Sequence, residues 1–136
     1  MPGPMEQSKV LKVILIVLAL PLVIFGAWRL FDPIGFAGFG GFVLPDDAGL
    51  LSEVRAAGGA VAVSGVIVLL GAFRPQRSFV SIVLAAVIFV SFGVARLLGI
   101  ALDGAPPSRI IQGMVTELVF GALALFVYFK YGRGEG

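Results

Sequence analysis

The sequence contains no cysteine and no histidine, and it has few charged residues. Without cysteine it has no disulfide, no thiol chemistry and no iron–sulfur ligand. Without histidine it lacks the usual ligands of zinc and haem and every His-based acid–base mechanism. Only 13% of its 136 residues are charged, whereas about 25% are charged in a typical soluble domain. These absences argue against most enzyme classes, and we expect no cofactor and no metal.

Apolar residues are abundant instead. Hydrophobic residues make up 59% of the chain, 19 further residues are glycine, and the mean hydropathy is +1.07. A protein of this size has too small a core to hide such a composition from water. We therefore predict an integral membrane protein. The net charge of +2 comes from basic residues that mark one side of the membrane, so no nucleic-acid partner is expected.

Long apolar stretches lie between the charged residues. Three of them are uncharged, namely Val13–Trp28, Ala56–Phe73 and Ser78–Ala95, and a fourth, Ile110–Phe129, contains only Glu117. A helix needs about 20 mostly apolar residues to cross a membrane, and flanking Lys and Arg side chains can extend to the interface. We predict an all-α bundle of four transmembrane helices, at residues 10–31, 50–73, 78–102 and 109–130. A β-barrel is excluded because these stretches are apolar on all sides rather than alternating.

The first apolar stretch has a signal peptide as its alternative. We expect it to be retained, because it is long for the apolar region of a signal peptide, about 7–15 residues, and lacks the small residue of a cleavage site. Residues 32–42 are predicted to form a short interfacial helix in the first extracytoplasmic loop. Asp32-Pro33 is typical of a helix start, and the spacing of Phe36, Phe39 and Phe42 gives a Phe-rich edge for lipid. A Gly-rich loop is the alternative for this segment.

Basic residues predict the orientation. One side of the predicted bundle has Lys9, Lys12, Arg74, Arg77, Lys130 and Arg133. The other side mixes four arginines with five acidic residues, namely Arg29, Arg55, Arg96, Arg109, Asp32, Asp46, Asp47, Glu53 and Asp103. We expect a single domain in the bacterial inner membrane, with antiparallel neighbouring helices and both termini in the cytoplasm.

Charged residues within the predicted spans need an explanation, because charge in a membrane is costly. Arg96 and Glu117 lie at nearly equal distances from the turn between the third and fourth predicted helices, so an ion pair is expected. The intramembrane polar cluster predicted in the outer half of the bundle comprises Arg29, Glu53, Arg55, Arg96, Asp103 and Glu117. Two interpretations stay open: a structural ion-pair network, and a polar pocket that binds a headgroup or passes a proton through Glu117.

Small residues predict where neighbouring helices approach closely. Gly113 and Gly121 flank Glu117 at intervals of four residues, on the face assigned to the third predicted helix. A second such stripe is predicted at Ala56, Ala60 and Ser64.

Several short segments, in this order and spacing, resemble a known family. They are Glu53-Val54-Arg55-Ala56-Ala57-Gly58-Gly59, the Arg74-Pro75 turn, Phe92 to Arg96, and Thr116-Glu117-Leu118. The chain is similar from about Lys9 to Tyr128 to a bacterial family of small four-helix membrane proteins catalogued as a domain of unknown function. The resemblance implies a fold and a membrane location, and no reaction.

The sequence leaves several functions open. The leading hypothesis is a non-enzymatic accessory or interaction subunit, or a lipid-binding bundle, with membrane lipids as partners and a larger complex or homo-oligomer as its setting. The alternative is a small oligomeric transporter or proton-coupled exporter that uses Glu117. A membrane enzyme ranks third, because no nucleophile–base pair and no metal cluster is recognisable.

Overall fold

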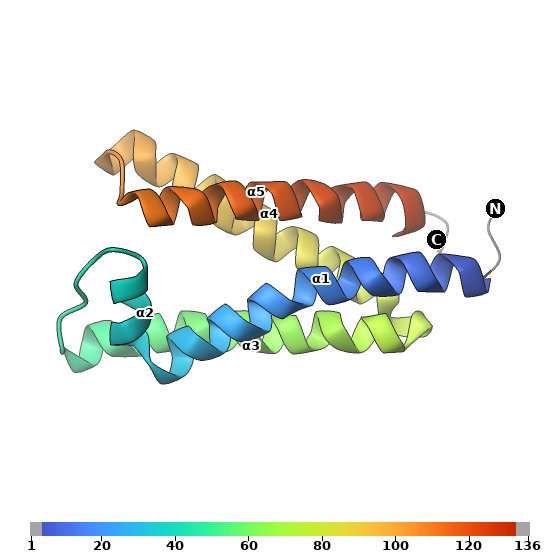
Figure 1. Cartoon of the computed structure of the whole chain (residues 1–136), viewed down its shortest axis with the longest axis horizontal. Helices are drawn as coiled ribbons and strands as arrows, with labels where there is room; N and C mark the ends of the chain where they lie inside the picture. Colours follow the sequence, from blue (N-terminus) through green and yellow to red (C-terminus); the bar gives the residue numbers. More distant parts are fainter. Residues whose placement is uncertain (1–3, 133–136) are drawn as a thin grey trace.

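The computed structural model describes residues 4–132, and this part of the chain is helical with short connections and no strand (Figure 1). Its elements in order are α1 (Pro4–Phe31), α2 (Pro33–Phe39), α3 (Ala48–Phe73), η1 (Pro75–Arg77), α4 (Ser78–Asp103), α5 (Ser108–Val127) and η2 (Tyr128–Gly132). The predicted all-α fold with four long helices and one short helix is confirmed. The boundaries differ in detail: α1 begins six residues before the predicted start, and α5 ends at Val127, before a π-helical turn.

Four of the helices are long and apolar enough to cross a membrane. At 1.5 Å per residue, the 26 residues of α3 extend about 39 Å, more than the thickness of a hydrocarbon core. Only 22–33% of the most apolar window of each span is buried within the protein. The remaining apolar surface faces outward, which suits a lipid environment, and the chain is a membrane protein.

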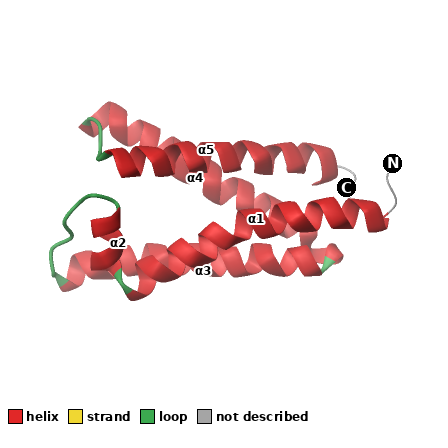
Figure 2. Cartoon of the chain, in the orientation of Figure 1, coloured by secondary structure: helices red, strands yellow, loops and turns green. Residues whose placement is uncertain are grey.

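Aspartates begin two of the helices. The Asp32 carboxylate accepts a hydrogen bond from the Gly35 amide at 3.1 Å, and the Asp47 carboxylate accepts one from the Leu50 amide at 3.0 Å. Each bond satisfies a backbone donor that has no partner within its helix. Ser108 can act as a cap by sequence, but it is the first residue of α5, which begins without a side-chain cap. The longest connection runs from α2 to α3 (Figure 2).

The long helices associate as two antiparallel pairs, α1 with α3 and α4 with α5. Figure 1 shows that the two pairs converge at the end where α1 begins and separate toward the end that carries α2. The tight turn from α3 to α4 joins the pairs at the closed end. There, the Ser78 hydroxyl donates to the Gly71 carbonyl and the Ser81 hydroxyl to the Ile67 carbonyl, each at 3.0 Å.

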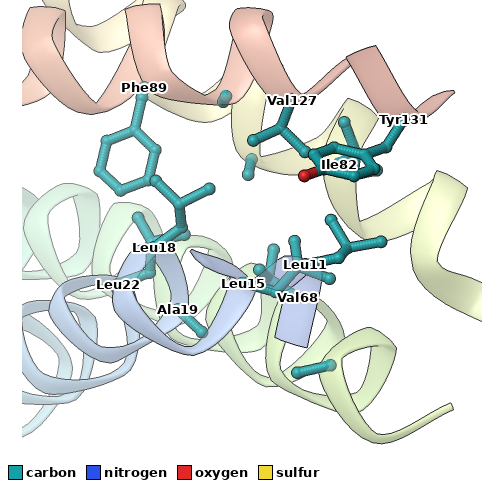
Figure 3. Packing of buried hydrophobic residues seen from close by; sticks show 13 residues of the cluster. Leu11, Leu15, Leu18, Ala19, Leu22, Val68, Ile82, Phe89, Val127 and Tyr131 are labelled. Carbon is teal, nitrogen blue, oxygen red and sulfur yellow. The ribbon is translucent and has the colours of Figure 1, made fainter. Parts of the chain in front are cut away.

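Buried aliphatic and aromatic side chains from all four long helices fill the closed end (Figure 3). Leu15 and Leu18 of α1, Val68 of α3 and Ile82 of α4 are essentially inaccessible to solvent. Val127 of α5 completes this layer. Burial of these side chains holds the two pairs together at one end only, because the cluster does not extend past Leu22 and Phe89 toward α2.

Glycines bring α1 and α3 into backbone contact. A Cβ atom on Gly58 would lie 2.6 Å from the Leu30 nitrogen, and one on Gly65 would lie 2.7 Å from the Val23 nitrogen. These distances leave no room for a side chain. The predicted stripe of Ala56, Ala60 and Ser64 is therefore wrong as the contact face, since both alanines are exposed. The contact lies instead on the face of Gly58 and Gly65, one heptad apart.

The adjacent glycines of α3 provide a matched test of this contact. We expect Gly58→Ala to destabilise the protein by about 1–3 kcal/mol, because its methyl group would overlap the α1 backbone. Gly59→Ala is the control. Its Cβ would lie 3.8 Å from the Leu30 Cδ1 atom, so the variant should be neutral or gain up to about 1 kcal/mol of helix propensity. Thermal unfolding of both variants in one detergent measures the difference; equal stabilities would contradict the close packing.

Candidate functional site

A cavity of about 600 Å³ lies in the half of the bundle that carries α2. All five α-helices contribute to its wall, because the two helix pairs separate here and α2 lies across the space between them. The wall is mainly apolar and rich in phenylalanine, with Phe25, Phe36, Phe39, Phe42 and Phe92. Three arginines and two glutamates also line it, namely Arg29, Arg96, Arg109, Glu53 and Glu117. The lining thus carries one net positive charge.

The expected pair of Arg96 and Glu117 is present and joins α4 to α5. The Arg96 Nε atom lies 2.7 Å from Oε1 of Glu117, and Nη2 lies 3.4 Å from Oε2. The side chains are 28% and 19% exposed. Two parallel contacts to one carboxylate make this a charge-assisted fork, so Arg96 is neutralised where it lines the cavity.

Arg29 projects from the last turn of α1 and is only half-buried, but it has a different environment. Within residues 4–132, its guanidinium has no carboxylate at salt-bridge distance and donates no hydrogen bond within the protein. It lies over two rings instead, 4.7 Å from the centroid of Phe36 and 5.7 Å from that of Phe92. Such cation–π contacts contribute about 0.5–2 kcal/mol, and they leave the charge of Arg29 without a counter-charge.

An aromatic cluster fixes α2 against α1. The Trp28 ring centroid lies 5.5 Å from that of Phe36 and 5.0 Å from that of Phe39, and Phe25 lies 6.4 Å from both. The Trp28 indole N–H also donates to the Asp32 carboxylate at 3.3 Å. Phe36 and Phe39 were predicted to contact lipid. Their rings instead contact α1 and line the cavity. A phenylalanine ring suits lipid contact and the wall of a cavity equally well. Only the fold shows which of the two these rings do.

One face of α5 contributes several polar residues to the cavity, and these were not predicted as a group. Arg109, Gln112, Gly113, Thr116 and Glu117 all line the cavity. Their spacing of three and four residues is that of one helix face, and this spacing was the available signal. Arg109 stands at the start of the helix, and its guanidinium carbon lies 4.5 Å from the ring centroid of Phe39. It therefore connects α5 to α2 across the cavity.

The six residues of the predicted cluster do not form one site. Arg29, Glu53, Arg96 and Glu117 line the cavity, whereas Arg55 and Asp103 do not. Arg55 instead donates to the Leu30 carbonyl at 2.7 Å, which satisfies an acceptor in the last turn of α1. Asp103 is exposed at the end of α4.

The two glycines of the predicted α5 stripe also have different surroundings. A Cβ on Gly121 would lie 3.0 Å from the Val90 Cγ2 atom of α4, which confirms close packing at that position. A Cβ on Gly113 would meet no other atom within 4 Å, since Gly113 faces the cavity.

The chain matches one known family along most of its length. The match covers residues 10–128 and is to a domain of unknown function, DUF4345. No curated protein and no solved structure matches it. The match includes every residue that lines the cavity, so the site lies within the family's domain. The chain belongs to the DUF4345 family of domains of unknown function.

Proposed function

We propose that this protein is a non-enzymatic lipid-binding protein of the bacterial inner membrane, which holds a lipid in the cavity between its helix pairs. Its partners are membrane lipids, and it acts as an accessory or interaction subunit in a larger complex or homo-oligomer. The observation that carries the proposal is the cavity itself. Its volume of about 600 Å³ lies in the range of small-molecule sites, and so does its mainly apolar wall with a few polar groups.

Access to the cavity supports an amphipathic ligand. Phe25, Phe39 and Phe42 line it and are still 41–42% exposed, so the cavity opens to the surface. It extends from Ile88 and Phe89, in the middle of α4, to α2 and the first turn of α5. A lipid can place its polar group among the charged residues there and its chains against the phenylalanine rings.

The non-enzymatic assignment is supported by the composition. The chain has no cysteine and no histidine, and the described residues contain no cluster of carboxylates suited to a metal. The charged groups of the cavity are mostly arginines, which stay protonated and do not serve as general bases. Binding is therefore a better use of this site than catalysis.

A transporter that uses Glu117 is the alternative, and one observation favours it: this carboxylate lines the cavity. A carrier carboxylate must exchange its proton or cation during the cycle. Arg96 already occupies this carboxylate at 2.7 Å, so a transported cation would have to displace the guanidinium group. Lipid binding requires no such exchange, so it fits the geometry better.

The orientation is part of the proposal, with both termini in the cytoplasm, and the absence of cysteine makes it directly testable. We expect Asp46→Cys, in the loop after α2, to react with a membrane-impermeant maleimide in spheroplasts. Gln76→Cys, in the turn between α3 and α4, should react only after permeabilisation. Both positions are exposed. The reverse labelling pattern would contradict the orientation.

Filling the cavity tests the lipid-binding proposal. Gly113→Leu should fold normally, because a Cβ there meets no other atom within 4 Å, but its side chain should occupy the space of the ligand. We expect the wild-type protein to keep a lipid through purification in mild detergent, as measured by native mass spectrometry, and the variant to lose most of it. Gly99→Leu is the matched control, since Gly99 also faces open space but lies outside the cavity. A wild-type protein that retains no lipid, or equal retention in both variants, would overturn the proposal.

A double-mutant cycle on the ion pair separates lipid binding from transport. If the pair is structural, Glu117→Gln should cost about 1–3 kcal/mol, below the range for a fully buried pair because both side chains are partly exposed. Arg96→Met combined with Glu117→Leu should recover much of that loss, since it removes both charges. Thermal unfolding of the wild-type protein and both variants in one detergent measures these differences. Glu117→Gln with wild-type stability would instead favour the transporter.

A further inference from the structure

We propose that Arg29 binds the headgroup of an anionic phospholipid and thereby gives the cavity a preference for net negative lipids. This inference rests on the proposed lipid binding and names its ligand class and its anchoring residue. The family match assigns no role to Arg29, and the sequence places this residue only within a cluster of six charged residues.

The charge of Arg29 lacks the carboxylate partner that the neighbouring Arg96 has. Arg96, the neighbouring cation in the cavity, is neutralised by Glu117 at 2.7 Å. Both guanidinium groups lie within 6 Å of the Phe92 ring, Arg29 at 5.7 Å and Arg96 at 5.8 Å. Arg29 alone of these two lacks a carboxylate among residues 4–132. Arg29 is half-buried, and a partly buried charge is costly to leave unpaired, so an anion entering the cavity would supply the missing counter-charge.

Glu53 is the remaining carboxylate of the cavity. It is exposed and lies in the second turn of α3. The side chain of Arg29 begins beside Gly58, five residues farther along α3, or roughly 7.5 Å deeper at 1.5 Å per residue. The two groups make no ion pair in the described part of the chain. Arg29 therefore remains available within the cavity.

The groups around Arg29 suit an anionic lipid headgroup. Guanidinium groups bind phosphate through paired N–H donors, and basic pockets between membrane helices bind anionic headgroups. The rings of Phe36 and Phe92 flank this group and offer apolar contact to the glycerol and the first part of the acyl chains. The net charge of +1 on the lining favours a lipid of charge −1 over a zwitterionic lipid. Free phosphate would leave the apolar wall unused.

Trp28 provides the measurement. It is the only tryptophan of the chain, and it contacts the two α2 rings that line the cavity, at 5.5 Å and 5.0 Å. Delipidated protein in dodecyl maltoside is titrated with dioleoylphosphatidylglycerol, with dioleoylphosphatidylcholine and with inorganic phosphate, while Trp28 fluorescence is recorded. We expect saturable binding of both lipids, with phosphatidylglycerol at least about tenfold tighter, and no competition from millimolar phosphate.

Three variants assign the preference to Arg29. Arg29→Gln should bind both lipids with the affinity that the wild-type protein has for phosphatidylcholine. Arg29→Lys keeps the charge but not the paired donors, so it should retain part of the preference. Arg55→Gln is the matched control, because it removes one charge from the same end of the bundle outside the cavity. It should leave the preference unchanged, and thermal unfolding checks the fold of each variant.

Each outcome has one meaning. Equal affinity of the wild-type protein for the two lipids overturns the role of Arg29 and leaves lipid binding intact, whether or not Arg29→Gln folds. An unchanged preference in folded Arg29→Gln, or an equal loss in Arg55→Gln, also overturns it. Competition by phosphate alone overturns the lipid as the source of the anion. Absence of any saturable lipid binding overturns the proposed function as well.

Discussion

The backbone contact between α1 and α3 is the constraint on which the half of the molecule that carries α2 depends. Gly58 and Gly65 allow the two helices to approach so closely that no side chain fits between them. This contact places the last turn of α1, and with it Arg29, directly against α3. The same turn leads through Asp32 into α2. The packing of the last turn of α1 against α3 thus determines the position of α2 over the cavity.

The two ends of the bundle differ because different residues fill them. At the closed end, Leu15, Leu18, Val68 and Ile82 interdigitate and exclude solvent. Toward α2, the α1–α3 pair continues to pack tightly through its glycines, and Arg96 with Glu117 holds α4 to α5. Each pair is therefore held together by its own contacts at this end. Between the pairs, mainly apolar side chains, many of them phenylalanines, and a few charged ones line a cavity where a core would otherwise continue.

Much of this fold is predictable from the sequence because a membrane imposes simple rules. The spacing of charged residues located all four long helices, and equal depth from a short turn paired Arg96 with Glu117. The contact faces were harder. Ala56 and Gly58 are both small and only two residues apart, so composition alone does not indicate which one faces α1. The choice depends on the rotation of α3 about its axis, which is set by packing along its whole length. The role of Phe36 and Phe39 depends likewise on the direction in which α2 folds back.

Three arginines in the same half of the bundle illustrate what sequence alone leaves undetermined. Arg96 is neutralised by a carboxylate, and Arg55 is bound to a carbonyl oxygen at the end of α1. Both use their charge to hold helices together, as a structural network requires. Arg29 is surrounded by rings that stabilise a cation without neutralising it. These ring contacts join α1 to α2 and α4 but leave the charge without a carboxylate partner in the described part of the chain. Its position at an open cavity is consistent with binding a ligand that supplies the missing negative charge.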